Sequence, residues 1–109
     1  MPFIRDSGTV TPDTLGVAKV VKTLTAEGGM FQFELNAKAL VNGEVLRIQV
    51  KKKTLTGSTL DIVFDEEYAD IQAKPVIFSI PIPALHQIQF EITQTGGTLR
   101  AYEWAVWVH

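Results

Sequence analysis

The stretch from Met30 to Phe64 most constrains how this chain folds, because apolar and polar residues alternate along it in three successive runs. A period of two places each apolar set on one face of a β-strand, so that one side meets a core and the other meets water or a partner. The pattern predicts three strands, whose apolar sets run from Phe31 to Ala39, from Leu46 to Val50 and from Leu60 to Phe64.

Two turn signals separate these three strands. Asn42-Gly43 is typical of a tight β-hairpin, because both residues accept the positive φ angles of a type I′ turn. Thr56-Gly57-Ser58 is a looser turn signal of the same kind. Together they predict an antiparallel meander of three strands.

Short strands are also expected over residues 17–24, 75–80, 88–92 and 99–108. Pro81-Ile82-Pro83 lacks two amide donors, so it marks either a sheet edge or a crossing from one sheet to another. Turns recur about every ten residues, which is typical of sandwiches and small barrels. The sequence therefore predicts an all-β fold, an antiparallel β-sandwich of jelly-roll or Greek-key type.

Residues 1–16 have a different character, with two prolines, two glycines and four Ser or Thr residues but little periodicity. They predict an extended N-terminal arm, followed by a single β-sandwich domain over residues 17–109. Phe3 and Ile4 need cover if the arm is ordered, either against their own domain or on a neighbouring subunit.

Composition excludes several classes of function. The net charge of −2 argues against nucleic acid binding, which usually leaves a basic excess, and acids follow the one basic run, Lys51 to Lys53. Without cysteine there is no disulfide framework and no Cys-based metal site or nucleophile. Residues 1–8 contain no apolar signal core, and no apolar run is long enough to cross a bilayer. We therefore expect synthesis in a cytoplasm, no nucleic acid partner and no membrane.

No pattern of catalytic residues stands out. His86 and His109 are the two histidines, neither has a carboxylate at ligand spacing, and no serine lies in a Gly-X-Ser-X-Gly setting. The acidic segment 65–74 does not follow the ligand spacing of a known calcium loop. The sequence predicts no catalytic, cofactor-binding or metal-binding residue, and hence no enzyme.

The aromatic C-terminus is the least ordinary feature of the chain. If Trp104 faces the core together with Tyr102, Val106 and Val108, then Trp107 faces the opposite way. Trp107 then either packs under the arm or a loop, forms a platform for a sugar ring, or anchors a subunit contact. The following residues are the candidate subunit or ligand contacts: Phe3, Ile4, Tyr102 and Trp107.

Two turn-rich segments, Lys53 to Thr59 and Gln94 to Trp104, together with Ala73-Lys74-Pro75-Val76, resemble small structural proteins of tailed-bacteriophage virions, of the capsid-decoration or cement type. The resemblance implies a homo-oligomer, a trimer or a dimer, that binds the major capsid protein or another virion protein. It implies location in the virion after synthesis in the host cytoplasm. Such a protein stabilises an assembled shell through many individually weak contacts.

Two other functions remain as alternatives. A carbohydrate-binding β-sandwich module would align Trp107 with Tyr68 or Tyr102 in an exposed groove. A cupin-like metal site or enzyme subunit is the weakest alternative, because the chain has no histidine cluster.

Overall fold

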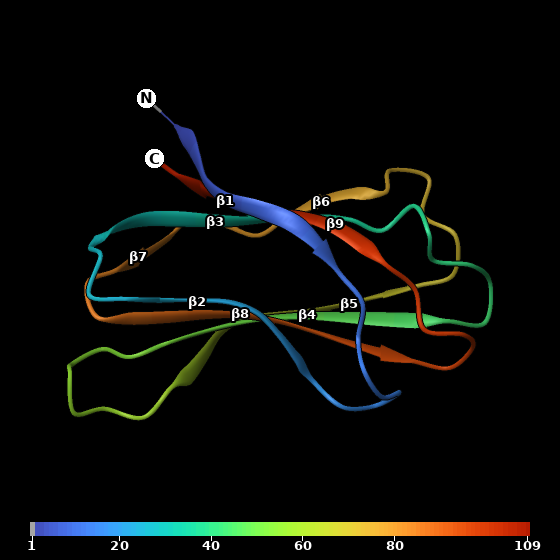
Figure 1. Cartoon of the computed structure of the whole chain (residues 1–109), viewed down its shortest axis with the longest axis horizontal. Helices are drawn as coiled ribbons and strands as arrows, with labels where there is room; N and C mark the ends of the chain where they lie inside the picture. The colour runs from blue at the N-terminus through green and yellow to red at the C-terminus, as the bar shows by residue number, and fades with distance from the viewer. Residues whose placement is uncertain (1) are drawn as a thin grey trace.

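The computed structural model describes residues 2–109, which form two β-sheets packed face to face without any helix (Figure 1). The strands of this range, in chain order, are β1 (Phe3–Val10), β2 (Lys19–Thr25), β3 (Gly29–Asn36), β4 (Val45–Lys52), β5 (Asp61–Ala69), β6 (Val76–Phe78), β7 (Ile82–Ala84), β8 (Gln87–Thr95) and β9 (Tyr102–Val108).

Sheet A has the order β1-β9-β3, and the short strands β6 and β7 share the far edge of β3. Sheet B has the order β2-β8-β4-β5. All of the strand pairs are antiparallel. The prediction of an all-β antiparallel sandwich is confirmed, while its assignment to the jelly-roll or Greek-key type stays a prediction.

The core lies between the sheets and is built from the inward-facing residues of the central strands. The predicted alternation holds on β8 and β4, where the apolar residues of each set are at most 1% exposed. Phe33 of sheet A stacks on Phe90 of sheet B, with ring centroids 5.2 Å apart. Burying each large apolar side chain contributes on the order of 2 kcal/mol, so these strands carry most of the stability of the fold. The buried central set comprises Phe31, Phe33, Leu35, Leu46, Ile48, Val50, Ile88, Phe90, Ile92, Tyr102 and Val106.

The predicted hairpin at Asn42-Gly43 is wrong, because β3 belongs to sheet A and β4 to sheet B. The two residues do form a turn, in which the Glu44 amide donates to the Val41 carbonyl, but of the pair only Gly43 has a positive φ, of 90°. Ala37 and Leu40, at 0% and 1% exposure, are buried in the connection that precedes this turn. The connection therefore crosses the end of the core rather than reversing within one sheet. The second predicted reversal is confirmed, because β4 and β5 pair as an antiparallel hairpin.

The N-terminal segment is extended and joins the sandwich as an edge strand. Residues 3–10 form β1, which pairs along β9 of the same chain, whereas Met1 lies outside the described residues. Val10 is the one buried residue of this strand. Backbone pairing rather than apolar periodicity holds β1 in place, and for this reason the sequence pattern did not predict a strand there.

Each long edge strand contains one extra residue relative to its partner. The register shifts after Ile4 in β1, after Val20 in β2 and opposite Val50 in β5, which leaves Arg5, Val21 and Val63 as the bulged residues. A bulge twists an edge and disrupts its row of free hydrogen-bonding groups, so that another strand adds to it poorly. The remaining edge is formed by β6 and β7. Pro81-Ile82-Pro83 lies on this edge, which agrees with the first of the two predicted alternatives, a position at a sheet edge.

Candidate interaction surface

The outer face of sheet B carries two paired sets of charged groups, together with the exposed apolar residues Val20 and Ile62, at 46% and 52% exposure. The Arg47 guanidinium binds both carboxylate oxygens of Asp65, with Nε at 2.7 Å from Oδ1, and holds the pKa of that carboxyl below its usual range. Glu91, only 3% exposed, receives Lys51 Nζ at 3.2 Å and the side-chain amide of Gln89. These groups satisfy one another, so this face offers little unmet hydrogen-bonding capacity to a ligand.

The outer face of sheet A carries exposed apolar side chains along one edge. Ile77 and Ile82 point into the core, so their neighbours on β6 and β7 point outward. Val76 and Phe78 register with Asn36 and Glu34 of β3 and are 43% and 51% exposed. We call the following four exposed residues the apolar strip: Met30, Val76, Phe78 and Ile80.

Trp104 and Trp107 lie on opposite faces of β9, as the alternation predicts. Trp104 packs against the core, and a Cβ on Gly8 of β1 would lie 3.4 Å from its indole nitrogen. Trp107 lies on the outer face, half-buried, and its Nε1 donates to Glu34 Oε1 at 2.6 Å. The hydrogen bond ties the indole to Glu34, which registers with Phe78 of the apolar strip.

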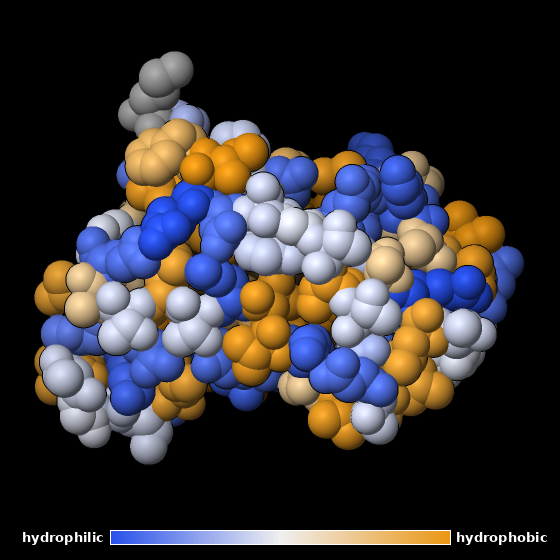
Figure 2. Space-filling view, in the orientation of Figure 1, coloured by the Kyte–Doolittle hydropathy of each residue, from blue (hydrophilic) through white to orange (hydrophobic). Residues whose placement is uncertain are grey.

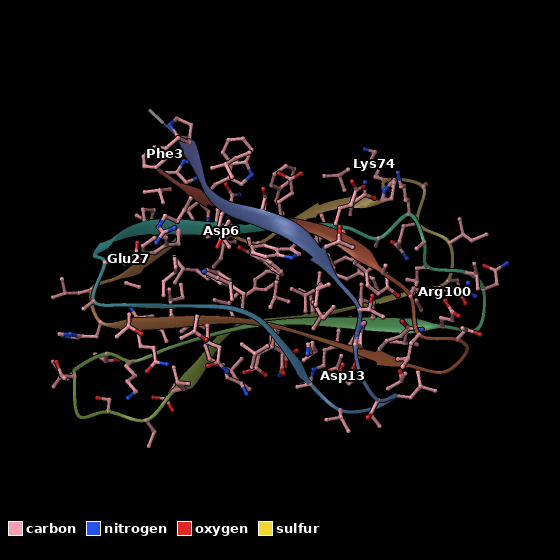
Figure 3. All side chains as sticks on the ribbon, viewed as in Figure 1. Phe3, Asp6, Asp13, Glu27, Lys74 and Arg100 are labelled. Atoms are coloured by element: carbon pink, nitrogen blue, oxygen red, sulfur yellow. The ribbon has the colours of Figure 1, made fainter. Side chains whose placement is uncertain are left out.

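The structure brings two of the four candidate contact residues together. Ile4 registers with Trp107 on the outer face of sheet A. Phe3, labelled at the free end of β1 in Figure 3, registers with Val108 and therefore points to the opposite face. Phe3 and Ile4 are 58% and 49% exposed. Tyr102 is different, because its side chain is fully buried and its hydroxyl donates to Gln94 Oε1 at 2.9 Å. Its burial removes Tyr102 from the candidate contacts and raises its pKa to about 12.

A shallow groove of about 260 Å³ lies beside Glu34, the residue that accepts the hydrogen bond from the Trp107 indole. Glu34, Asn36, Glu103, Trp104 and Ala105 line it, and Trp107 lies just outside this lining. Glu103 is also the partner of Lys38, at 3.6 Å between charged atoms. Acceptor oxygens beside an indole form a surface that can hydrogen-bond to hydroxyl groups.

One buried polar cluster was not predicted from the sequence. Glu44, 2% exposed, accepts hydrogen bonds from the amides of Val41 and Thr98 and pairs with Arg100 at 3.1 Å. Gly97 lies against this carboxylate so closely that a Cβ there would overlap it. Gln94 connects the remaining residues of the cluster. Its Oε1 accepts a hydrogen bond from the backbone amide of Arg100, and its side-chain amide donates to the Thr98 carbonyl at 2.6 Å. The cluster joins the end of the β3–β4 connection to the β8–β9 turn, and the adjacent glycines were its only signal in the sequence.

His86 lies apart from both surfaces, with its Nδ1 3.1 Å from Thr56 Oγ1 beside a small pocket of about 140 Å³. Over residues 2–109, no group of three or more His, Cys, Asp or Glu side chains is placed to hold a metal ion. Nor does that range contain a helix that could span a membrane.

Comparison with known proteins gave no match to a family model, to a curated protein or to a solved structure.

Proposed function

We propose that the chain is a non-enzymatic structural protein of a virion, of the capsid-decoration type, which binds an assembled shell through the apolar strip on sheet A. The strip carries this proposal. Its four side chains are each at least 39% exposed, and they come from neighbouring parts of sheet A: β3, β6 and the β6–β7 connection. Exposed apolar groups that gather in this way are typical of protein-binding surfaces.

The ion pairs on sheet B and the apolar strip on sheet A together support one orientation on a shell. Sheet B, with its paired charges, faces solvent, and sheet A faces the shell protein. Trp107 lies near the strip, and tryptophan is enriched among residues that dominate binding energy at interfaces. Each contact of this size is weak, and an oligomer that engages several shell subunits at once gains affinity through effective concentration.

The test uses particles made from the genome that encodes this chain, purified on a density gradient and probed with an antibody against the recombinant protein. We expect the chain to sediment with the particles, and Phe78→Ser to lower its occupancy about tenfold, as expected for loss of one central apolar contact. Leu55→Ser is the matched control, because Leu55 is 66% exposed and lies in the β4–β5 connection, outside the apolar strip. Absence of the chain from purified particles would overturn the proposal.

A second function is favoured by a separate observation, the polar groove near Trp107. In this alternative the chain is a carbohydrate-binding module, in which the indole stacks on a sugar ring and Glu34, Asn36 and Glu103 accept its hydroxyl protons. Tyr102 is buried and Tyr68 belongs to sheet B, so neither tyrosine supplies the aromatic contact, which would come from Trp107 beside the groove. Titration with an oligosaccharide panel, followed by tryptophan fluorescence, separates the two functions. Saturable quenching that Trp107→Ala abolishes would favour the module.

A further inference from the structure

Strand β1 has an unusual relation to the sheet that it completes. Seven of its residues register with β9, but Val10 alone is buried. The other side chains contribute little apolar burial, so the backbone ladder and ion pairs hold the strand. Arg5 binds Glu27 with Nε 2.8 Å from Oε1, and Asp6 binds Lys22 at 2.7 Å.

Both of these ion pairs lie in partly exposed positions. The side chains of Arg5 and Glu27 are 39% and 32% exposed, and those of Asp6 and Lys22 are each 34% exposed. Pairs at such positions are screened by water and add little to stability. Detaching β1 therefore breaks backbone hydrogen bonds but opens only a small part of the core.

The connection from β1 to β2, residues 11–18, is suited to opening. Pro12 is its only buried residue, and its backbone is anchored to the sandwich by one hydrogen bond, from the Gly16 amide to the Gln94 carbonyl. Figure 3 shows Asp13 on this connection, away from Phe3 at the other end of β1. Fully extended, eight residues reach about 26 Å, enough to lead β1 to a neighbouring molecule.

Three exposed apolar side chains lie in or just after this connection, and the single chain leaves them uncovered. Leu15, Val17 and Val20 are 41%, 57% and 46% exposed. Figure 2 shows apolar surface along this side of the molecule, between the more polar groups of the two sheets. If the connections of two chains ran side by side, these residues would cover one another.

From these features we propose that β1 is exchanged between copies of the chain, so that β1 of one copy pairs with β9 of a second copy. The exchanged strand makes the same contacts as it does within one chain, and the paired connections add the burial of Leu15 and Val17. Strand exchange of this kind gives a closed dimer, or a closed ring of three, at low cost. The inference rests on the proposed structural function, for which it supplies the oligomer.

The absence of cysteine permits a direct test, because a disulfide can be introduced at a chosen place. Thr9 and Glu103 are exposed antiparallel partners, and such pairs have Cα atoms about 5 Å apart, within disulfide range. A chain with Thr9→Cys and a second chain with Glu103→Cys are mixed, unfolded and refolded together at high concentration, and then oxidised. Random exchange between equal amounts of the two chains can link at most half of the molecules, so we expect the disulfide-linked heterodimer to approach half of the protein on a non-reducing gel.

The control mixture pairs Thr9→Cys with Thr95→Cys, since Thr95 is also exposed but belongs to sheet B. It should yield at least tenfold less heterodimer. Equal yields from the two mixtures would show random collision and would overturn the inference. So would the absence of heterodimer in the first mixture while the Thr9→Cys/Glu103→Cys double variant closes its own disulfide.

The oxidised double variant also separates this inference from the proposed function. When this variant is refolded and oxidised at high dilution, its β1 is locked on its own β9, so sedimentation equilibrium should find a monomer where the parent chain is a dimer or trimer. A locked chain that still forms the oligomer would overturn strand exchange and leave the shell-binding proposal intact. If the locked chain is a monomer but the parent chain is absent from particles, strand exchange is supported and the shell-binding proposal is overturned.

Discussion

Asp6 and Lys22 form an ion pair of 2.7 Å that joins sheet A to sheet B along the open side of the sandwich. Each residue directly follows the bulged residue of its own edge strand. The bulge changes the alternation at that point and turns both charged groups toward the gap between the sheets. Inward-pointing charges at edges oppose pairing with further strands, and here the two charges also neutralise one another.

Replacing Asp6 with Asn should have a small effect on global stability but a larger local one. A partly exposed pair contributes about 0–1 kcal/mol, so the urea midpoint should move little. The amides of β1 should exchange with deuterium faster, because one of the two side-chain ties of this strand is lost. Unchanged exchange in β1 would mean that the ion pair does not hold the strand.

Deleting residues 1–14 tests whether the sandwich folds without β1. Because Val10 is the only buried side chain of the strand, we expect the remaining chain to keep a cooperative melting transition at a lower temperature. The truncated chain should also lose its ability to assemble. A synthetic peptide of residues 2–14 should raise the melting temperature again, and a scrambled peptide is the control. Loss of the cooperative transition would show that β1 is part of the folding core.

Gly97 should not tolerate a side chain. Its φ is +68°, and a Cβ would overlap the carboxylate of Glu44, so Gly97→Ala combines backbone strain with displacement of the buried cluster. We expect a loss on the order of 2 kcal/mol or more in the free energy of unfolding. Gly16→Ala is the matched control, since Gly16 has a φ of +77° but no atom within 4 Å of the added Cβ. Equal losses in the two variants would mean that the contact with Glu44 does not matter.

Tyr102 should make stability fall in strongly alkaline solution. Its pKa is about 12 in the folded chain and about 10 when unfolded, so above pH 10 the unfolded state releases the proton first. Stability is fully present below pH 10 and declines up to about pH 12, by on the order of 2 kcal/mol. Tyr102→Phe should flatten this decline in urea unfolding measured from pH 9 to 12. Tyr68, whose pKa is also raised by burial, supplies the smaller slope that remains.

Glu44 should affect the stability of the fold in acidic solution. The hydrogen bond from Arg100 holds the pKa of this carboxyl below its ordinary value. Its contribution is present above that ordinary value and is lost as the pH falls through the folded-state pKa. We expect acid unfolding to begin at higher pH in Arg100→Met, because the carboxylate keeps only its amide donors. An unchanged acid midpoint would rule out this pair as a stabilising contact.

The central strands could be predicted from the sequence because burial on one face imposes a period of two. Ile88, Phe90 and Ile92 all point inward, as their spacing requires. The hairpin at Asn42-Gly43 could not be assigned in the same way, since a turn signal is local and does not say which sheet receives the next strand. Burial of Leu40 at the end of the core decides that the chain crosses over.

Two other features lack any local signal in the sequence. An edge strand such as β1 is held by its backbone, and so its composition resembles that of a loop. The candidate site and the buried cluster depend on residues far apart in the chain, since the strand register brings Ile4 to Trp107 and the packing of two connections brings Glu44 to Arg100. The exposed position of Trp107 followed from alternation on β9, whereas the hydrogen bond from its indole to Glu34 required the fold.

The bulges at Arg5, Val21 and Val63 bear on whether the edge strands of neighbouring copies pair with one another. If copies of the chain gather on a shell, as we propose, their edges meet at very high local concentration, where regular edges would join into fibres. An extra residue in each long edge interrupts that growth, so neighbouring copies meet through side chains and stay separate. Deleting one bulged residue would realign the edge and convert a discrete subunit into the seed of a filament.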